Sequence, residues 1–102
     1  RYLLSARSIE LVAMLESAHG RYQVSAQEVE ALEQGMLREA QEAVRAAETA
    51  YQLGERSILD VLDAQRVLRT VRLNLLNALF DRQAARIEID ELRAAALQGG
   101  RP

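Results

Sequence analysis

The chain contains one strong turn signal, which lies between two long stretches of helical periodicity. Gly54 stands where a first helix would end, because glycine adopts the left-handed conformation at little cost and lets its amide reach the last carbonyls. Ser57 and Asp60 then have the S-x-x-D spacing of a capping box, which marks the start of a second helix. Only Glu55 and Arg56 separate the two signals, so the sequence predicts two antiparallel helices joined by a tight turn.

The stretch before the turn, at about residues 8–52, has apolar positions at spacings of three and four, which is typical of an amphipathic helix. This stripe consists of Tyr22, Ala26, Val29, Leu32, Met36, Ala40, Ala43, Ala47 and Ala50. Gly20 and Gly35 interrupt it, but an isolated glycine costs only about 1 kcal/mol relative to alanine. We therefore expect a continuous or bent helix, with a break after His19 as the less favoured alternative.

The stretch after the turn, at about residues 58–97, has a more regular heptad pattern. Its seam consists of two series spaced by sevens and broken only by Arg82: Val61, Leu68, Leu75, Ile89 and Ala96, and Ala64, Val71, Ala78, Ala85 and Leu92. Such a seam predicts knobs-into-holes packing on the first helix. A second apolar set lies outside the seam: Ile58, Leu62, Leu73, Leu76, Leu79, Phe80 and Ile87. A two-helix hairpin cannot cover both, so we expect at least one further helix to pack there.

Charged residues agree with a chain reversal near Glu55. In that antiparallel register, four acid–base pairs face each other: Glu42 with Arg69, Glu39 with Arg72, Glu28 with Arg82, and Arg21 with Glu88. Exposed pairs contribute only about 0.2 to 1 kcal/mol each, so they select the register more than they stabilise the fold.

Composition supports an all-α fold, namely one long antiparallel coiled-coil hairpin over residues 1–102. Helix formers dominate and strand signals are missing. We expect a disordered tail at 98–102. The 13 arginines nearly balance 15 acidic residues, which gives no case for nucleic acid binding. The sequence has no cysteine and no apolar run long enough to span a membrane. Because the first residue is arginine, we expect a piece of a longer protein.

Enzymatic and metal-binding interpretations have little support in the sequence. Glu16 and His19 have the E-x-x-H spacing of di-iron bundles, but such sites need two copies and His19 is the single histidine. The run Arg66, Arg69 and Arg72 lacks interleaved aromatic residues, so we expect it to pair with glutamates across the hairpin rather than to track phosphates. We predict no catalytic site, no metal site and no cofactor.

The side chains at the turn admit two interpretations. Asp60 and Asp63 share a face in the first turns of the second helix, where the helix dipole favours negative charge. They can simply stabilise that helix end, Asp63 with Arg45 as a partner, or they can form a protruding acidic tip that becomes a ring in a symmetric assembly. Tyr51 is similarly ambiguous, and from the residues alone it can simply cover the apolar side of the turn. Arg56 can be solvated or bind a neighbour's carboxylate or carbonyls.

The tip residues also carry a resemblance. The run from Ala50 to Arg66, with the pattern x-Y-x-x-G-x-x-S-x-x-D-V-L-D-A, resembles the C-terminal helical hairpin of TolC-like outer-membrane efflux proteins. The resemblance extends over about Ala40 to Ala95. It implies a trimeric channel whose periplasmic α-barrel is built from such hairpins, whose tips form the entrance and meet the periplasmic adaptor of a tripartite pump that includes an inner-membrane transporter.

By position, the resemblance implies a role for each tip residue. Leu53, Gly54, Glu55 and Ser57 belong to the tip that meets the adaptor, Tyr51 and Arg56 match residues that hold the entrance closed, and Asp60 and Asp63 match acidic rings that favour cations. The exported substrate does not follow from it. An alternative is a coiled-coil interaction module, such as the adaptor's own hairpin or an unrelated scaffold. In an isolated fragment, the uncovered stripes favour pairing with a second copy.

Overall fold

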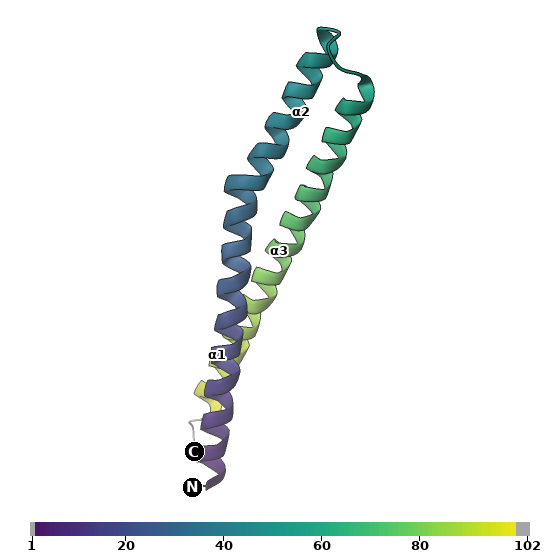
Figure 1. Ribbon diagram of the computed structural model, residues 1–102. Helices are drawn as coiled ribbons and strands as arrows, with labels where there is room; N and C mark the ends of the chain where they lie inside the picture. Colours follow the sequence, from purple (N-terminus) through teal and green to yellow (C-terminus); the bar gives the residue numbers. More distant parts are fainter. Residues whose placement is uncertain (1, 100–102) are drawn as a thin grey trace. The chain divides into compact units, whose positions relative to one another are not determined.

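The computed structural model describes residues 2–99, which are helical everywhere except at the turn 53–57. The elements in chain order are α1 (Tyr2–Ala31), a π-helical turn η1 (Leu32–Met36), α2 (Leu37–Gln52) and α3 (Ile58–Gly99). No strand occurs within these described residues. The predicted all-α hairpin class is confirmed, with α2 and α3 running antiparallel on either side of the turn (Figure 1).

The helix ends differ from the expected bounds at both termini. Helix α1 begins at Tyr2, earlier than the expected start near Ser8, and it passes through Gly20 without a break. At the other end, α3 continues through Gly99, so Gln98 and Gly99 are helical instead of part of the predicted tail. The rest of that tail, residues 100–102, lies outside the described residues.

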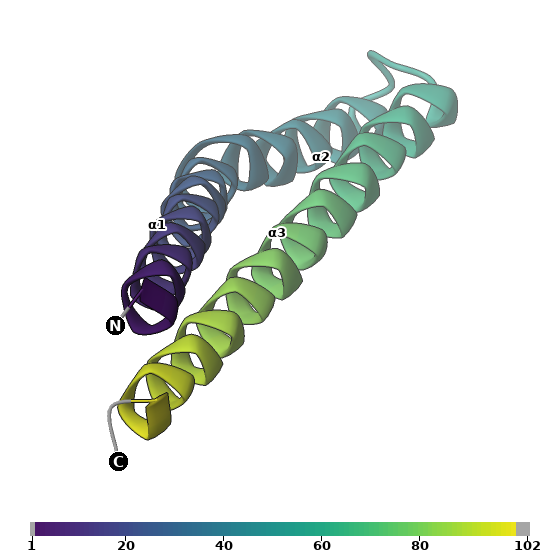
Figure 2. The ribbon, with the colours of Figure 1, turned by 90° about the horizontal axis from the view of Figure 1, so that it is seen from below.

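The chain divides into two compact units, and each pairs a segment of the first helical stretch with an antiparallel segment of α3. The tip unit comprises residues 27–78 and includes the turn. The terminal unit comprises residues 1–26 and 79–102, and within its described part the beginning of α1 and the end of α3 lie side by side (Figure 2). In the described part of each unit, the buried side chains form one layer between its two helical segments.

The buried residues form a narrow seam of small and branched side chains. The buried apolar residues of α3 are Val61, Leu68, Val71, Ala78, Ala85 and Ile89, all members of the predicted heptad seam. Their counterparts on the first helical stretch are Ala18, Val29, Leu32, Ala40 and Ala47, together with the hydroxyl-bearing Ser25. Alanines let two helices approach closely, so the seam is tight but removes little apolar area from water.

The apolar set outside the seam is uncovered, as the sequence predicts. In the tip unit, Ile58, Leu62, Leu73 and Leu76 are each about half exposed. In the terminal unit, Phe80 and Ile87 are exposed while Leu79 is half-buried. Packing by a further helix stays a prediction, and in each unit these side chains are the ones that it would contact. None of the helices in the described part of the chain is long and apolar enough to cross a membrane.

One expectation for the first helical stretch is wrong in detail. Met36 and Ala43, both placed on the buried stripe, are exposed, whereas Leu37 and Val44 are half-buried. The cause is the π-helical turn, in which the amide of Leu37 donates to the carbonyl of Leu32, five residues earlier. Such a turn holds one residue more than an α-helical turn, so beyond it Leu37 and Val44 accompany the buried Ala40 and Ala47, in place of Met36 and Ala43.

Candidate functional site

The turn that closes the tip unit is built by backbone hydrogen bonds around Gly54. Gly54 is the residue with positive φ in the described chain, at 74°. Its amide donates to the carbonyl of Tyr51 at 3.0 Å, and the amide of Glu55 donates to the carbonyl of Ala50 at 2.8 Å. These two bonds form a Schellman motif, which satisfies carbonyls that the end of α2 leaves unpaired. The predicted role of Gly54 as the helix stop is confirmed.

The start of α3 differs from the predicted capping box. Ser57 does precede the helix, but the amide of Asp60 donates to the backbone carbonyl of Ser57, at 3.1 Å, rather than to its hydroxyl. The hydroxyl has no hydrogen bond within residues 2–99. The first turn of α3 is therefore closed by the main chain, and the Ser57 side chain is free to face a partner.

The whole apex is open to solvent. Every residue from Tyr51 to Asp60 is exposed, including two leucines: Leu53, with 67% of its surface accessible, and Leu59, with 70%. Sequence reasoning placed Leu53 at the tip but missed Leu59. The available signal was its position, because Leu59 is an apolar residue in the first turn of α3 that belongs to neither series of the heptad seam.

The gating candidates have no internal partner. Within the described residues, the side chains of Tyr51 and Arg56 take part in no hydrogen bond or ion pair. Tyr51 is about half exposed at the end of α2, and Arg56 is exposed in the turn. Both can therefore donate to groups outside this chain.

The two aspartates lie on the surface at the beginning of α3. Asp60 is in its first turn, and Asp63 lies one turn further on. The Asp63 carboxylate is 3.7 Å from the guanidinium of Arg66, and the side chains of Asp63 and Arg66 are about three-quarters exposed. Among the described residues, the ion pair with Arg45 that one interpretation expects does not form. A pair that exposed contributes between zero and about 1 kcal/mol, so it leaves the negative charge available to ions or partners.

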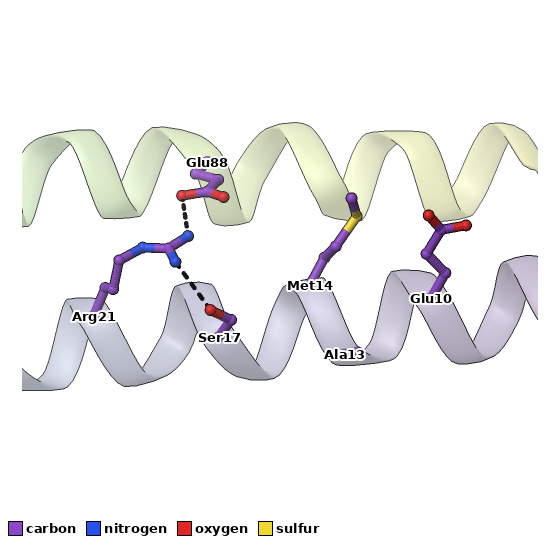
Figure 3. Close-up of a pocket in the computed structure, with 6 residues that line it drawn as sticks. All are labelled: Glu10, Ala13, Met14, Ser17, Arg21 and Glu88. Carbon is purple, nitrogen blue, oxygen red and sulfur yellow. Dashed lines mark hydrogen bonds and ion pairs between the residues drawn. The ribbon is translucent and has the colours of Figure 1, made fainter.

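The predicted charge pairs have mixed outcomes. In the terminal unit, Arg21 pairs with Glu88 as predicted, and the same guanidinium donates to Ser17 Oγ at 2.9 Å (Figure 3). In the tip unit, the pairs of Glu39 with Arg72 and Glu42 with Arg69 do not form. Glu28 and Arg82 belong to different units, so that pair stays a prediction.

A shallow groove of about 330 Å³ lies beside the Arg21 pair. It is lined by Glu10, Ala13, Met14, Ser17, Arg21 and Glu88, and Figure 3 shows Arg21 and Glu88 pointing toward each other from the two helical segments. Arg21 is already satisfied by Glu88 and Ser17, and the described residues contain no cluster of three metal-ligating side chains. The described residues of the groove therefore give no evidence of a ligand site, and the tip is the better candidate for the functional site.

Comparisons with known proteins agree with this geometry. The outer membrane efflux protein family matches residues 1–95. The chain is also 34% identical over 87 residues to the cobalt-zinc-cadmium resistance protein CzcC of Cupriavidus metallidurans, a match that covers 85% of this chain and 21% of that relative. The chain thus spans about a fifth of the relative's length. No solved structure matches it. With a family match over nearly its whole length, this helical hairpin belongs to the outer membrane efflux proteins.

Proposed function

We propose that this chain is a periplasmic hairpin of a trimeric outer-membrane export channel and that its apex docks the periplasmic adaptor of a tripartite pump. The observation that carries the proposal is an exposed apex, closed by main-chain hydrogen bonds, in a chain of the efflux family. Structural proteins of other classes, such as an unrelated coiled-coil scaffold, would not be expected to match this family over residues 1–95.

Adaptor docking is assigned to Leu53, Gly54, Glu55 and Ser57. The turn is held by main-chain bonds, so it should lose little conformational entropy on docking. Leu53 supplies an exposed apolar contact, while Glu55 and Ser57 supply acceptor groups. A partner hairpin with an apolar centre and donors around it fits this apex. Through that adaptor, the channel would connect to an inner-membrane pump.

Entrance gating is assigned to Tyr51 and Arg56. Neither side chain has a partner within residues 2–99, and a phenol and a guanidinium are both strong hydrogen-bond donors. A companion hairpin of the same channel would supply the acceptors. Hydrogen bonds of this kind would hold neighbouring hairpins together until the adaptor separates them.

Cation selection is assigned to Asp60 and Asp63. Three copies around a threefold axis would place six carboxylates near the entrance. Their negative charge would attract cations and repel anions. The relative's name refers to cobalt, zinc and cadmium resistance. We infer that divalent metal cations are the substrate class that best fits both the acidic tip and this similarity.

The test is the ion selectivity of the full-length channel with Asp60→Asn and Asp63→Asn. Removing six charges from the entrance should lower the cation-to-anion permeability ratio by roughly threefold at low salt, and by less at high salt because screening weakens the effect. Reversal potentials in planar bilayers under a salt gradient measure that ratio.

A matched control removes the same charge elsewhere. Asp81→Asn with Asp90→Asn changes two exposed aspartates of the terminal unit and should leave the ratio near the wild-type value. Equal ratios for the tip variant and the wild type would exclude Asp60 and Asp63 from the pore lining.

A further inference from the structure

The first helical stretch holds one residue more than a regular heptad pattern allows, and the π-helical turn η1 contains it. Buried residues advance by sevens from Ala18 to Ser25 to Leu32, then by eight to Ala40, and again by seven to Ala47. On α3 the corresponding steps, such as Val71 to Ala78 to Ala85, are all sevens. An α-helix turns by about 100° per residue, so an eight-residue step without a π turn would carry Ala40 away from the seam.

Helix α2 also carries a second apolar stripe, which the π turn leaves on the surface. If residues 32–36 were α-helical, the positions that follow Leu32 on the buried face would be Met36, Glu39, Ala43, Ala46 and Ala50. Four of these five are apolar, and Met36, Ala43 and Ala46 are now exposed. The stripe in use comprises Leu37, Ala40, Val44 and Ala47. The one polar member of the alternative stripe is Glu39, whose carboxylate would have to move to the seam.

We propose that η1 is a phase switch for α2. In its π form it places the stripe of Ala40 and Ala47 against α3, and in its α form it turns α2 by about 100° and places the stripe of Met36 and Ala43 there instead. The α form restores a regular helical turn but must bring Glu39 to the seam. The gain from the regular turn and the cost of burying the carboxylate therefore oppose each other. This device does not depend on adaptor docking or on the exported substrate.

Gly35 supports this assignment. It lies inside η1, has no positive φ, and a Cβ at its position would meet nothing within 4 Å. Glycine is therefore not required there for space or for backbone conformation. It does weaken the preference for an α-helical turn relative to alanine, which keeps the π form accessible.

The experiment measures maleimide labelling of a cysteine at Ala47 in the full-length protein, with any cysteines outside this chain replaced. Ala47 is 4% exposed, so labelling of Ala47→Cys should be slow. Glu39→Leu makes the alternative stripe fully apolar and should raise the labelling rate about tenfold, because burying a leucine favours the α form. Glu42→Leu lies on neither stripe and should leave the rate unchanged.

A variant that lacks Gln34 provides the control protein in which the effect of Glu39→Leu is measured again. Without one residue of η1, an ordinary α-helix keeps Ala40 and Ala47 in phase with α3, and no extra residue remains to drive a switch. In that background, Glu39→Leu should no longer accelerate labelling of Ala47→Cys. A rise of equal size with Gln34 deleted, or no rise in the wild-type background, would overturn the proposal.

Discussion

Replacing Val71 by aspartate is expected to unfold the tip unit. Val71 is 5% exposed in the middle of the α3 seam. The change loses about 1.5 to 3 kcal/mol of apolar burial and places a carboxylate where the described seam offers no cation, which adds several kcal/mol more. Total stability of a domain is only about 5 to 15 kcal/mol, and this seam is one layer of small side chains, so little native structure should remain.

Limited trypsin digestion of the full-length protein measures this effect. Cleavage after Arg66, Arg69 and Arg72 requires local unfolding of α3, so the Val71→Asp variant should be cut there much faster than the wild type. The matched control is Val67→Asp, one turn earlier on α3, where the valine is 51% exposed. A surface change of this kind shifts stability by about 0.5 kcal/mol. Equal cleavage of the two variants would contradict the seam described here.

Alanine substitutions at Gly54 and Gly20 are expected to change the stability of the fold in opposite directions: Gly54→Ala should lower it and Gly20→Ala should raise it. Added Cβ atoms meet nothing within 4 Å at either position, so steric contact with other residues does not decide the outcome. Gly54 has φ of 74°, a conformation that costs alanine about 1 to 2 kcal/mol. Gly20 lies inside α1 with ordinary helical geometry, where alanine is favoured by about 0.5 to 1 kcal/mol.

Hydrogen exchange of backbone amides in the full-length protein separates the two effects. Gly54→Ala should speed exchange of the Glu55 amide, which is bonded to Ala50, whereas Gly20→Ala should slow exchange within α1. A Gly54→Ala variant with unchanged protection at Glu55 would mean that the Schellman motif does not need the left-handed residue.

The parts that the sequence predicts well are those set by local chemistry or by an uninterrupted repeat. Gly54 ends α2 because few other residues adopt positive φ, and this holds whatever surrounds the turn. The α3 seam follows from heptad spacing, since no insertion disturbs that helix. The sequence alone therefore predicts both the end of α2 and the seam of α3.

The sequence does not predict the π turn, because α2 carries two apolar stripes. Met36 and Ala43 satisfy helical spacing as well as Leu37 and Val44 do, and composition alone does not distinguish the two phases. Ser57 offers two acceptors to the amide of Asp60, its hydroxyl and its carbonyl, and the structure uses the carbonyl. Of the cross-helix charge pairs, Arg21 with Glu88 forms, helped by Ser17, while Arg69 and Arg72 in the tip unit form no ion pair across the helices.

The roles of the tip side chains depend on neighbours that this chain does not include. The structure shows that Tyr51, Arg56, Asp60 and Asp63 are exposed, and their roles stay predictions. Which of them contacts an adaptor, a second hairpin or an ion is decided by surfaces outside residues 2–99.

Site-directed crosslinking of the apex tests the central claim most directly. Single cysteines at Leu53, Glu55 or Ser57 of the full-length protein should form adducts with the cognate periplasmic adaptor in cells, while a cysteine at Gln83, exposed in the terminal unit, should not. Adducts at the apex alone are the predicted result. Failure of all three apex positions, in cells whose pump is functional and where Gln83→Cys captures the adaptor instead, would contradict it.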